Sequence, residues 1–308
     1  MAQFPLLSPE RRLALLEPPR GPVEMVLDTD TYNEIDDQFA VVYALLSPNL
    51  TVRGLYAAPF YNSRSEGPAD GMERSYQEIL RLLDALGIGD RGLVYRGAGR
   101  YLPAEHEPAP SPAAEALIAQ ALAPREGPLY VLAIGAITNV ASALLMRPEI
   151  AERICIVWLG GHPHTWPTTA EFNLQQDIPA ARVVFDSGAA VVQIPCKNVA
   201  EHLRTTLPEI ETHVRGRGTV GDYLYRIYYD FAPDHYARSK VLWDISAVAY
   251  LNNPDWVPTA LVPSPIPQDD RTWAPVDESR HPIRVATDVR RDAIYGDLFR
   301  RLAAHAEG

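Results

Sequence analysis

Short apolar runs alternate with segments of helical periodicity along nearly the whole chain. Residues 129–134 and 154–159 are apolar at almost every position, which is typical of strands covered on both faces. The pattern predicts strands at residues 23–28, 51–57, 92–95, 128–134, 153–159, 189–194 and 258–263. It predicts helices at residues 36–46, 72–86, 112–123, 138–146, 179–187, 221–231, 244–251 and 291–305. Such alternation predicts a mainly parallel, Rossmann-like α/β sheet with helices on both faces.

The chain shows no obvious internal boundary. Its 308 residues could form one large α/β domain or two ordinary ones, so length alone does not decide. Neither an internal repeat nor a low-complexity linker is visible, and the Pro-rich stretches 102–112 and 262–275 resemble surface loops. We therefore predict a single domain over residues 1–308, with residues 1–20 as an N-terminal arm.

Composition narrows the class of partner. The formal net charge of −11 argues against nucleic acid or an anionic membrane as the partner, because the chain has too little positive charge to bind either. No stretch reaches the roughly 18 apolar residues of a membrane span, and the N-terminus lacks the apolar core of a signal peptide. Cys155 and Cys196 lie in apolar runs and are predicted to be buried thiols rather than a disulfide. These features predict a cytoplasmic protein.

Four aspartates follow the first predicted strand within ten positions: Asp28, Asp30, Asp36 and Asp37. Carboxylates this close raise one another's pKa unless a cation compensates, and residues 21–52 contain no lysine or arginine. Hard oxygen ligands without nearby His or Cys favour Ca²⁺ or Mg²⁺ over zinc. For any single aspartate, a solvated helix N-terminus is the simpler explanation. The whole cluster at a strand end, where α/β sheets bind ligands, favours a metal site.

Polar residues also follow other predicted strands. Asn62 comes after the second strand, and Thr138, a candidate helix N-cap, comes after the fourth. The sequence Ala170-Glu-Phe-Asn173 follows the fifth, and Trp243-Asp244 opens a late helix. Because parallel strands end at one edge of a sheet, we expect these residues to gather there.

Taken in order, these blocks resemble the nucleoside hydrolases, the inosine-uridine-preferring family of N-ribohydrolases. The resemblance spans residues 23–251 and includes Gly135-Ala-Ile-Thr-Asn139, which is similar to a helix start of that family. It implies calcium-dependent hydrolysis of the N-glycosidic bond of ribonucleosides to a free base and ribose. It also implies that the partner is a small nucleoside or riboside and that the protein is a homodimer or homotetramer.

The resemblance also implies roles for particular residues. The calcium ligands would be Asp30, Asp37, Asp244 and the backbone carbonyl of Ile134, and Asp30 would be the catalytic base for the attacking water. The ribose hydroxyls would be bound by Asp36, Asn62, Glu171 and Asn173. Trp243 would stack on the base, and its likeness to the purine-preferring branch of the family favours purines, although a stacking surface accepts either base type. The alternative for Trp243 is packing in the core. Carboxylates below the sugar would stabilise the positive charge that develops as the C1′–N bond breaks.

One loop departs from the family pattern, and one catalytic role stays unassigned. The loop from Asp30 to Asp37 is two residues longer than the family's Asp-Pro-Gly-x-Asp-Asp and brings Tyr32, Asn33 and Glu34 to the site. The group that protonates the leaving base is unassigned, and a histidine near its ordinary pKa is the expected kind of acid. The candidates are His162, His164, His235, Tyr228, Tyr229 and Tyr236.

Two alternative functions fit part of the pattern. Leu27-Asp-Thr-Asp-Thr31 is similar to the strand end of haloacid-dehalogenase-like phosphatases, in which Asp28 would be the nucleophile, Asp30 the acid/base and Mg²⁺ the cofactor. That reading leaves the residues around Glu171 and Asp244 unexplained. The other alternative is a catalytically silent homologue that binds a riboside, because a fold does not fix a function.

Overall fold

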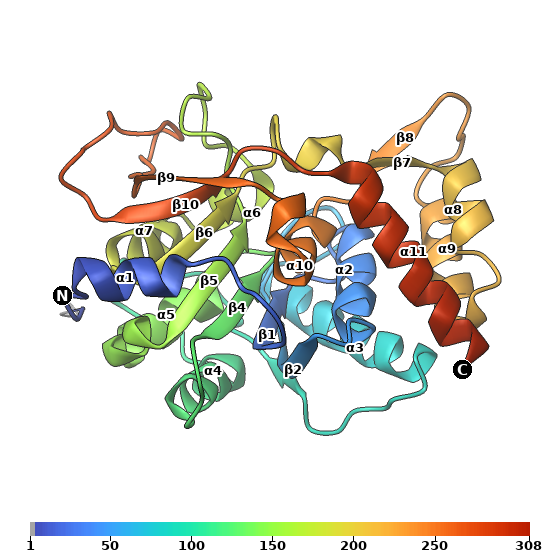
Figure 1. The fold of residues 1–308 in the computed structure, drawn as a ribbon, viewed down its shortest axis with the longest axis horizontal. Helices are drawn as coiled ribbons and strands as arrows, with labels where there is room; N and C mark the ends of the chain where they lie inside the picture. Colours follow the sequence, from blue (N-terminus) through green and yellow to red (C-terminus); the bar gives the residue numbers. More distant parts are fainter. Residues whose placement is uncertain (1–3) are drawn as a thin grey trace.

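An eight-stranded sheet runs through the middle of the molecule (Figure 1). The computed structural model describes residues 4–308. The spatial order of the strands is β3-β2-β1-β4-β5-β6-β10-β9. Their bounds are Val23–Thr29 (β1), Leu50–Ala57 (β2), Val94–Arg96 (β3), Leu129–Ala133 (β4), Ile154–Leu159 (β5), Ala190–Ile194 (β6), Thr259–Pro263 (β9) and Pro282–Ala286 (β10). Every neighbouring pair is parallel except β9 with β10. The predicted mainly parallel sheet is confirmed.

Helices cover both faces of this sheet, each over its own apolar core (Figure 1). One core contains side chains of α2 (Asp36–Leu45), α3 (Pro68–Ala85), α10 (Ile245–Asn252) and α11 (Arg291–Glu307). The other contains side chains of α4 (Pro112–Leu122), α5 (Thr138–Met146) and α7 (Ile178–Asp186). Successive side chains of a strand point to opposite faces, so Val131 of β4 packs in the second core and Leu132 in the first. Two apolar faces explain why the strands are apolar throughout.

A smaller group of elements lies at one end of the sheet, beyond α11 (Figure 1). It consists of β7 (Arg204–Thr206), α8 (Leu207–His213), α9 (Gly218–Asp230) and β8 (Ser239–Val241), with β7 and β8 antiparallel. The aromatic-rich α9 turns Val220, Leu224 and Tyr228 inward, as expected of a helix that faces the core. The loop that follows β8 leads to α10 and carries Trp243 and Asp244 towards the main sheet.

The structure contains elements that the sequence pattern did not predict. Strand β10 is missing from the prediction because its residues alternate in burial and include Arg284, whose side chain donates to the carbonyl of Leu16. Helix α1 (Pro9–Leu16) lies within the predicted arm, and its Leu15 and Leu16 join the core. The short elements α6 (Phe172–Gln176), α8, β7 and β8 were also missed. Over residues 4–308, no helix has the length and apolar character needed to cross a membrane.

Candidate active site

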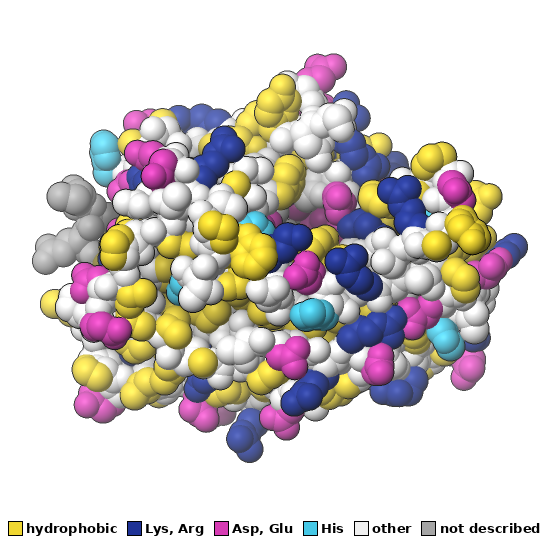
Figure 2. All heavy atoms as spheres, turned by 90° about the horizontal axis from the view of Figure 1, so that it is seen from above, with side chains coloured by type: hydrophobic (Ala, Val, Ile, Leu, Met, Phe, Trp, Pro, Cys, Tyr) yellow, Lys and Arg dark blue, Asp and Glu magenta, His cyan; other side chains and the backbone are white. Residues whose placement is uncertain are grey.

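A cavity of about 380 Å³ opens at the carboxyl ends of the parallel strands. In Figure 2 this face is hollowed near its centre, with acidic side chains inside and basic side chains beside it. Seven of the residues that the sequence nominated line it: Asp36, Asn62, Ile134, Glu171, Asn173, Trp243 and Asp244. The expectation that strand-end residues gather at one edge is therefore confirmed.

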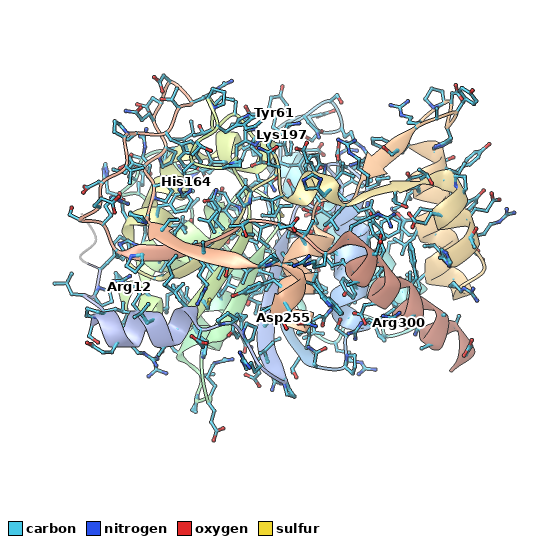
Figure 3. The ribbon with its side chains drawn as sticks, turned by 45° about the horizontal axis from the view of Figure 1, so that its top comes forward. Arg12, Tyr61, His164, Lys197, Asp255 and Arg300 are labelled. Carbon is cyan, nitrogen blue, oxygen red and sulfur yellow. The ribbon has the colours of Figure 1, made fainter. Side chains whose placement is uncertain are left out.

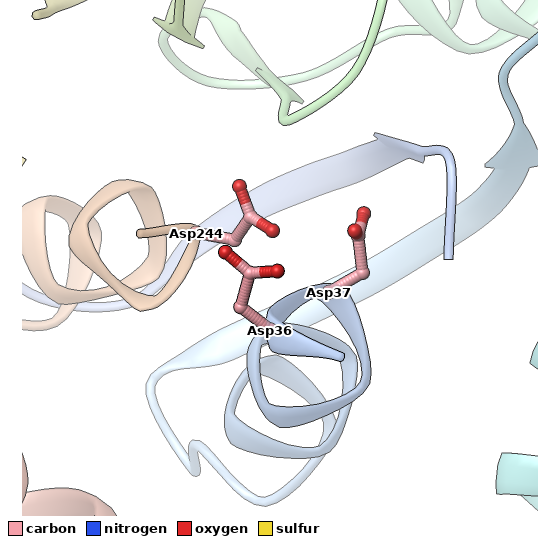
Figure 4. A group of neighbouring side chains, drawn as sticks. All are labelled: Asp36, Asp37 and Asp244. Atoms are coloured by element: carbon pink, nitrogen blue, oxygen red, sulfur yellow. The ribbon is translucent and has the colours of Figure 1, made fainter. Parts of the chain in front are cut away.

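Three aspartates from two distant parts of the chain meet at the floor of this cavity (Figure 4). Asp36 and Asp37 form the first turn of α2, and Asp244 immediately precedes α10. One carboxylate oxygen from each lies within 4.8 Å of the others. Two hydrogen bonds position the group: Thr29 Oγ1 donates to Asp37 at 2.6 Å, and the Trp243 backbone N–H donates to Asp36 at 3.1 Å.

The deeper acids of this cluster are buried and short of partners. Asp30 and Asp37 are fully buried, and both oxygens of Asp30 and Oδ2 of Asp37 have no hydrogen-bond partner. Burial and then the charge of Asp36 raise the pKa of Asp37 to about 8. Burial and neighbouring aspartate charges also raise the pKa of Asp30 and of Asp244 well above the ordinary range. Buried carboxylates of this kind need protons or a cation, so the oxygen-only donor set fits a hard divalent ion.

The tertiary structure brings one cation that the local sequence does not contain. Lys240 of β8 is largely buried, and its Nζ lies 2.6 Å from a carboxylate oxygen of Glu34. Burial alone would lower the pKa of Lys240, but the charges of Asp36 and Glu34 outweigh it and the net shift is upward. One ammonium beside this many carboxylates leaves the cluster negative. The local sequence lacks lysine and arginine, but the fold supplies Lys240. A metal is therefore inferred from the carboxylates that remain in excess of this one ammonium.

Two of the residues expected to bind ribose, Glu171 and Asn173, line the cavity and are held by hydrogen bonds. Glu171 is the N-cap of α6, and its carboxylate accepts backbone N–H bonds from Asn173 and Leu174 at 3.0 Å and from Gly161 at 2.7 Å. The Asn173 side-chain amide donates to the carbonyls of Ile134 and Leu159 at 3.1 and 3.0 Å. These anchoring bonds were not predicted. The ribose contacts themselves stay a prediction.

Asn62 and Thr138 also have structural partners. Asn62 donates from its side-chain amide to the carbonyl of Asn33 at 3.1 Å, which ties the strand β2 loop to the long loop before α2. Thr138 is the first residue of α5 rather than its N-cap, so that expectation was wrong. Its hydroxyl instead donates to Asp177 at 2.6 Å, a partner that only the tertiary fold supplies.

The candidates for the leaving-group acid are largely separated from the cavity. Of the six, only His162 lines it. His164 is hydrogen-bonded to Gln193 and packs against Trp273, Tyr228 donates to a backbone carbonyl, and Tyr236 is 88% exposed. Burial and then the nearby charge of Lys197 lower the pKa of His162, which disfavours its protonated form. The leaving-group acid stays unassigned.

Lys197 and Cys196 were not predicted as site residues, although both line the cavity. They follow strand β6, and their position after a strand end was the available signal. Lys197 lies at the same upper edge of the molecule as Tyr61 (Figure 3). Cys196 and Cys155 are buried and unpaired, as expected.

The phosphatase alternative is not favoured by this geometry. Asp28, its required nucleophile, is fully buried beneath the cavity lining. Its Oδ1 accepts a 2.7 Å hydrogen bond from the Asn139 amide. Burial raises the pKa of Asp28 to about 7, although the bond from Asn139 opposes that shift. One oxygen of Asp28 is thus occupied by a structural hydrogen bond, whereas both oxygens of Asp30 have no hydrogen-bond partner.

Comparison with known proteins agrees with the site. The family model described as inosine-uridine preferring nucleoside hydrolase matches residues 25–296. The chain belongs to this family. Among curated members, the pyrimidine-specific ribonucleoside hydrolase RihA of Escherichia coli O127:H6 is 33% identical over 191 residues, and RihA of Citrobacter koseri is 33% identical over 180. The first match covers 54% of this chain and 58% of the relative, so the chain aligns with little more than half of that protein.

Solved structures of family members share the fold. A plant nucleoside hydrolase, PpNRh1, superposes with a TM-score of 0.74 at 23% identity, over 92% of this chain and 99% of its own. A purine-preferring ribonucleoside hydrolase from Gardnerella vaginalis gives a TM-score of 0.70 at 24% identity, with the same coverage of both chains. At these identities the likeness establishes the nucleoside hydrolase fold.

Proposed function

We propose that this family member hydrolyses the N-glycosidic bond of ribonucleosides, releasing a free base and ribose, and that it depends on Ca²⁺. One observation carries the proposal: Asp36 and Asp244 line a cavity at the carboxyl edge of the sheet and meet the buried Asp37, which has an oxygen without a hydrogen-bond partner. Family membership supplies the class of reaction. The 380 Å³ cavity is of the size that a small molecule occupies.

The ion would be held by Asp30, Asp37, Asp244 and the backbone carbonyl of Ile134. The side-chain amide of Asn173 donates to that carbonyl, which orients it and leaves a second lone pair for a cation. When bound, calcium supplies positive charge that favours deprotonation of water and orients sugar hydroxyls. A cation also removes the cost of burying several carboxylates together.

Residues of the chain would activate the attacking water and bind the ribose. Asp30 accepts the proton of the attacking water as general base, because no hydrogen bond within the protein occupies its oxygens. The ribose hydroxyls are bound by Asp36, Asn62, Glu171 and Asn173. As the bond to the base breaks, these carboxylates stabilise the positive sugar ring more than the neutral substrate, which is the origin of the rate enhancement.

The preferred base is a separate part of the proposal. Trp243 lines the cavity beside Asp244 and offers an aromatic surface for the base. That placement supports stacking of either base type, and the purine preference rests on the resemblance of Trp243 to the purine-preferring branch of the family. The named relatives differ, since the curated ones are pyrimidine-specific and one structural relative is purine-preferring.

The test is release of reducing sugar from a panel of purine and pyrimidine ribonucleosides, with Ca²⁺ or EDTA. The proteins are wild type, Asp37→Ala and, as control, Asp84→Asn, which changes an exposed carboxylate on α3. Calcium-dependent release lost only in Asp37→Ala supports the proposal. Calcium binding and riboside binding without release would instead identify a silent homologue. Light scattering on the same samples checks the expected homodimer or homotetramer.

A further inference from the structure

Both lysines of this chain lie at the proposed active site, and each is paired with a glutamate. Lys197 lines the cavity and pairs with Glu201 at 3.5 Å. Lys240 pairs with Glu34 at 2.6 Å. The pairs differ in one respect: Glu34 itself lines the cavity, and Glu201 does not. Glu34 is therefore a carboxylate that a substrate can reach.

The long loop that carries Glu34 is held in place at several points. Lys240 Nζ also donates to the carbonyl of Val241 at 2.8 Å, which anchors the ammonium on β8. Arg64 donates to the backbone carbonyl of Glu34 at 2.9 Å, and its guanidinium lies 4.6 Å from the ring centroid of Tyr32. These contacts fix both the backbone and the side chain of Glu34. A group fixed before the ligand arrives loses little entropy on binding.

Glu34 keeps capacity to bind a ligand. Lys240 is hydrogen-bonded to Oε2, and within residues 4–308 no donor is hydrogen-bonded to Oε1. The side chain is 43% exposed. A carboxylate accepts about four hydrogen bonds and donates none when ionised. It therefore favours a ligand edge that carries N–H groups and disfavours one that carries a carbonyl oxygen.

Glu34 and Trp243 both line the cavity, on segments that the fold joins. Lys240 lies three residues before Trp243, and Asp36 lies two residues after Glu34. The Trp243 backbone N–H donates to Asp36, so the segments carrying Glu34 and Trp243 are joined. An aromatic face next to a fixed acceptor suits a planar heterocycle, which stacks on one and hydrogen-bonds the other.

We propose that Glu34, positioned by Lys240, determines specificity by accepting a hydrogen bond from the exocyclic amino group of the leaving base. This inference rests on the proposed function and deepens it, because it names the substrate class as amino-bearing ribonucleosides. It applies to purines and pyrimidines alike. A hydrogen bond to a charged group changes affinity by about 10- to 100-fold.

The experiment compares nucleosides that differ at the amino group. Guanosine is compared with inosine, which lacks it, and cytidine is compared with uridine, which has an oxygen there. For each pair we would measure kcat/KM by base release and binding by calorimetry, both with Ca²⁺. The variants are Glu34→Gln, which removes the charge at nearly constant size, and Lys240→Gln, which removes the anchor. The matched control is Glu201→Gln, the partner of the other lysine.

We expect wild type to prefer the amino-bearing member of each pair by roughly tenfold or more. Glu34→Gln should bring both ratios close to one, Lys240→Gln should lower them through KM, and Glu201→Gln should leave them unchanged. Wild-type ratios near one, or ratios that Glu34→Gln does not move, overturn the inference while hydrolysis itself upholds the proposed function. Selective binding without hydrolysis, lost in Glu34→Gln, upholds the inference and overturns the proposed function. Absence of both binding and hydrolysis overturns both.

Discussion

Replacing Asp37 by asparagine should change how stability depends on pH when no cation is bound. In the fold, burial and the charge of Asp36 raise the pKa of Asp37 from 3.8 to about 8. An acid with a raised pKa keeps its proton in the folded state after the unfolded chain has lost it. The free energy of unfolding therefore falls as pH rises between those two values. Asparagine cannot titrate, yet its carbonyl still accepts the hydrogen bond from Thr29.

The magnitude follows from one proton over a chosen pH window. Three histidines, His162, His164 and His281, have lowered pKa values and contribute the opposite slope, which ends near their ordinary pKa of 6.5. Between pH 6.5 and 8, one retained proton contributes at most about 1.4 kcal/mol per pH unit, or about 2 kcal/mol in all. For 308 residues, this corresponds to a fall of about 3 °C in Tm, taking roughly 2.1 cal/mol/K of unfolding entropy per residue.

The assay is thermal unfolding in EDTA at pH 6.5, 7, 7.5 and 8, repeated with excess Ca²⁺. In EDTA, the Tm of wild type should fall between pH 6.5 and 8 by about 3 °C more than the Tm of Asp37→Asn. At pH 8 the variant should be the more stable protein. Calcium should raise the Tm of wild type and should have little effect on Asp37→Asn. Asp84→Asn, an exposed substitution on α3, should follow wild type. Equal slopes for wild type and Asp37→Asn would refute the argument.

Three further substitutions test other parts of the structure. Asp244→Asn should weaken calcium binding at least tenfold, measured by calorimetry, because it removes an acidic ligand from the three-aspartate group. Unchanged affinity would contradict the assignment of Asp244 as a calcium ligand. Glu171→Gln should lower the urea-unfolding free energy by about 1 kcal/mol, because glutamine replaces one of the two oxygens that accept backbone N–H bonds with an NH2 group, and an unaltered midpoint would show that the cap contributes little. Tyr43→Phe should cost about 1–2 kcal/mol by removing the 2.7 Å bond to Asp297 at unchanged activity, and a loss of activity would argue against a purely structural role.

Much of the fold could be predicted because buried positions of strands and helices are occupied by apolar residues. Strands β4 and β5 are apolar at every position since helices cover both faces, and all seven predicted strands are present within a few residues. Elements with mixed or polar sequences were missed. Strand β10 has Arg284 in its middle, and α6 has only five residues, with a glutamate cap that resembles any loop acid. Such elements owe their stability to tertiary partners rather than to their own pattern.

Several residues of the candidate site could be predicted from the sequence, but their hydrogen-bond partners and pKa shifts could not. Strand-end aspartates Asp36 and Asp37 and the distant Asp244 were identified in advance, and the fold brings their carboxylates together. Chain order could not show that Glu171 caps a helix or that burial and Lys197 lower the pKa of His162. Hydrogen-bond partners and pKa shifts depend on distances across the fold, which local sequence does not encode.

By itself, the sequence determined the alternation of strands and helices and the concentration of acids at one strand end, because hydrophobic period and residue type are local properties. Only the tertiary structure decided that Lys240 reaches Glu34 across more than two hundred residues and that Glu34 faces the cavity. The charge of the site depends on every charged group that the fold brings there. The buried ammonium of Lys240, from a distant strand, therefore changes that charge. For that reason the acidic cluster could be recognised from the chain, whereas the basis of its specificity required the fold.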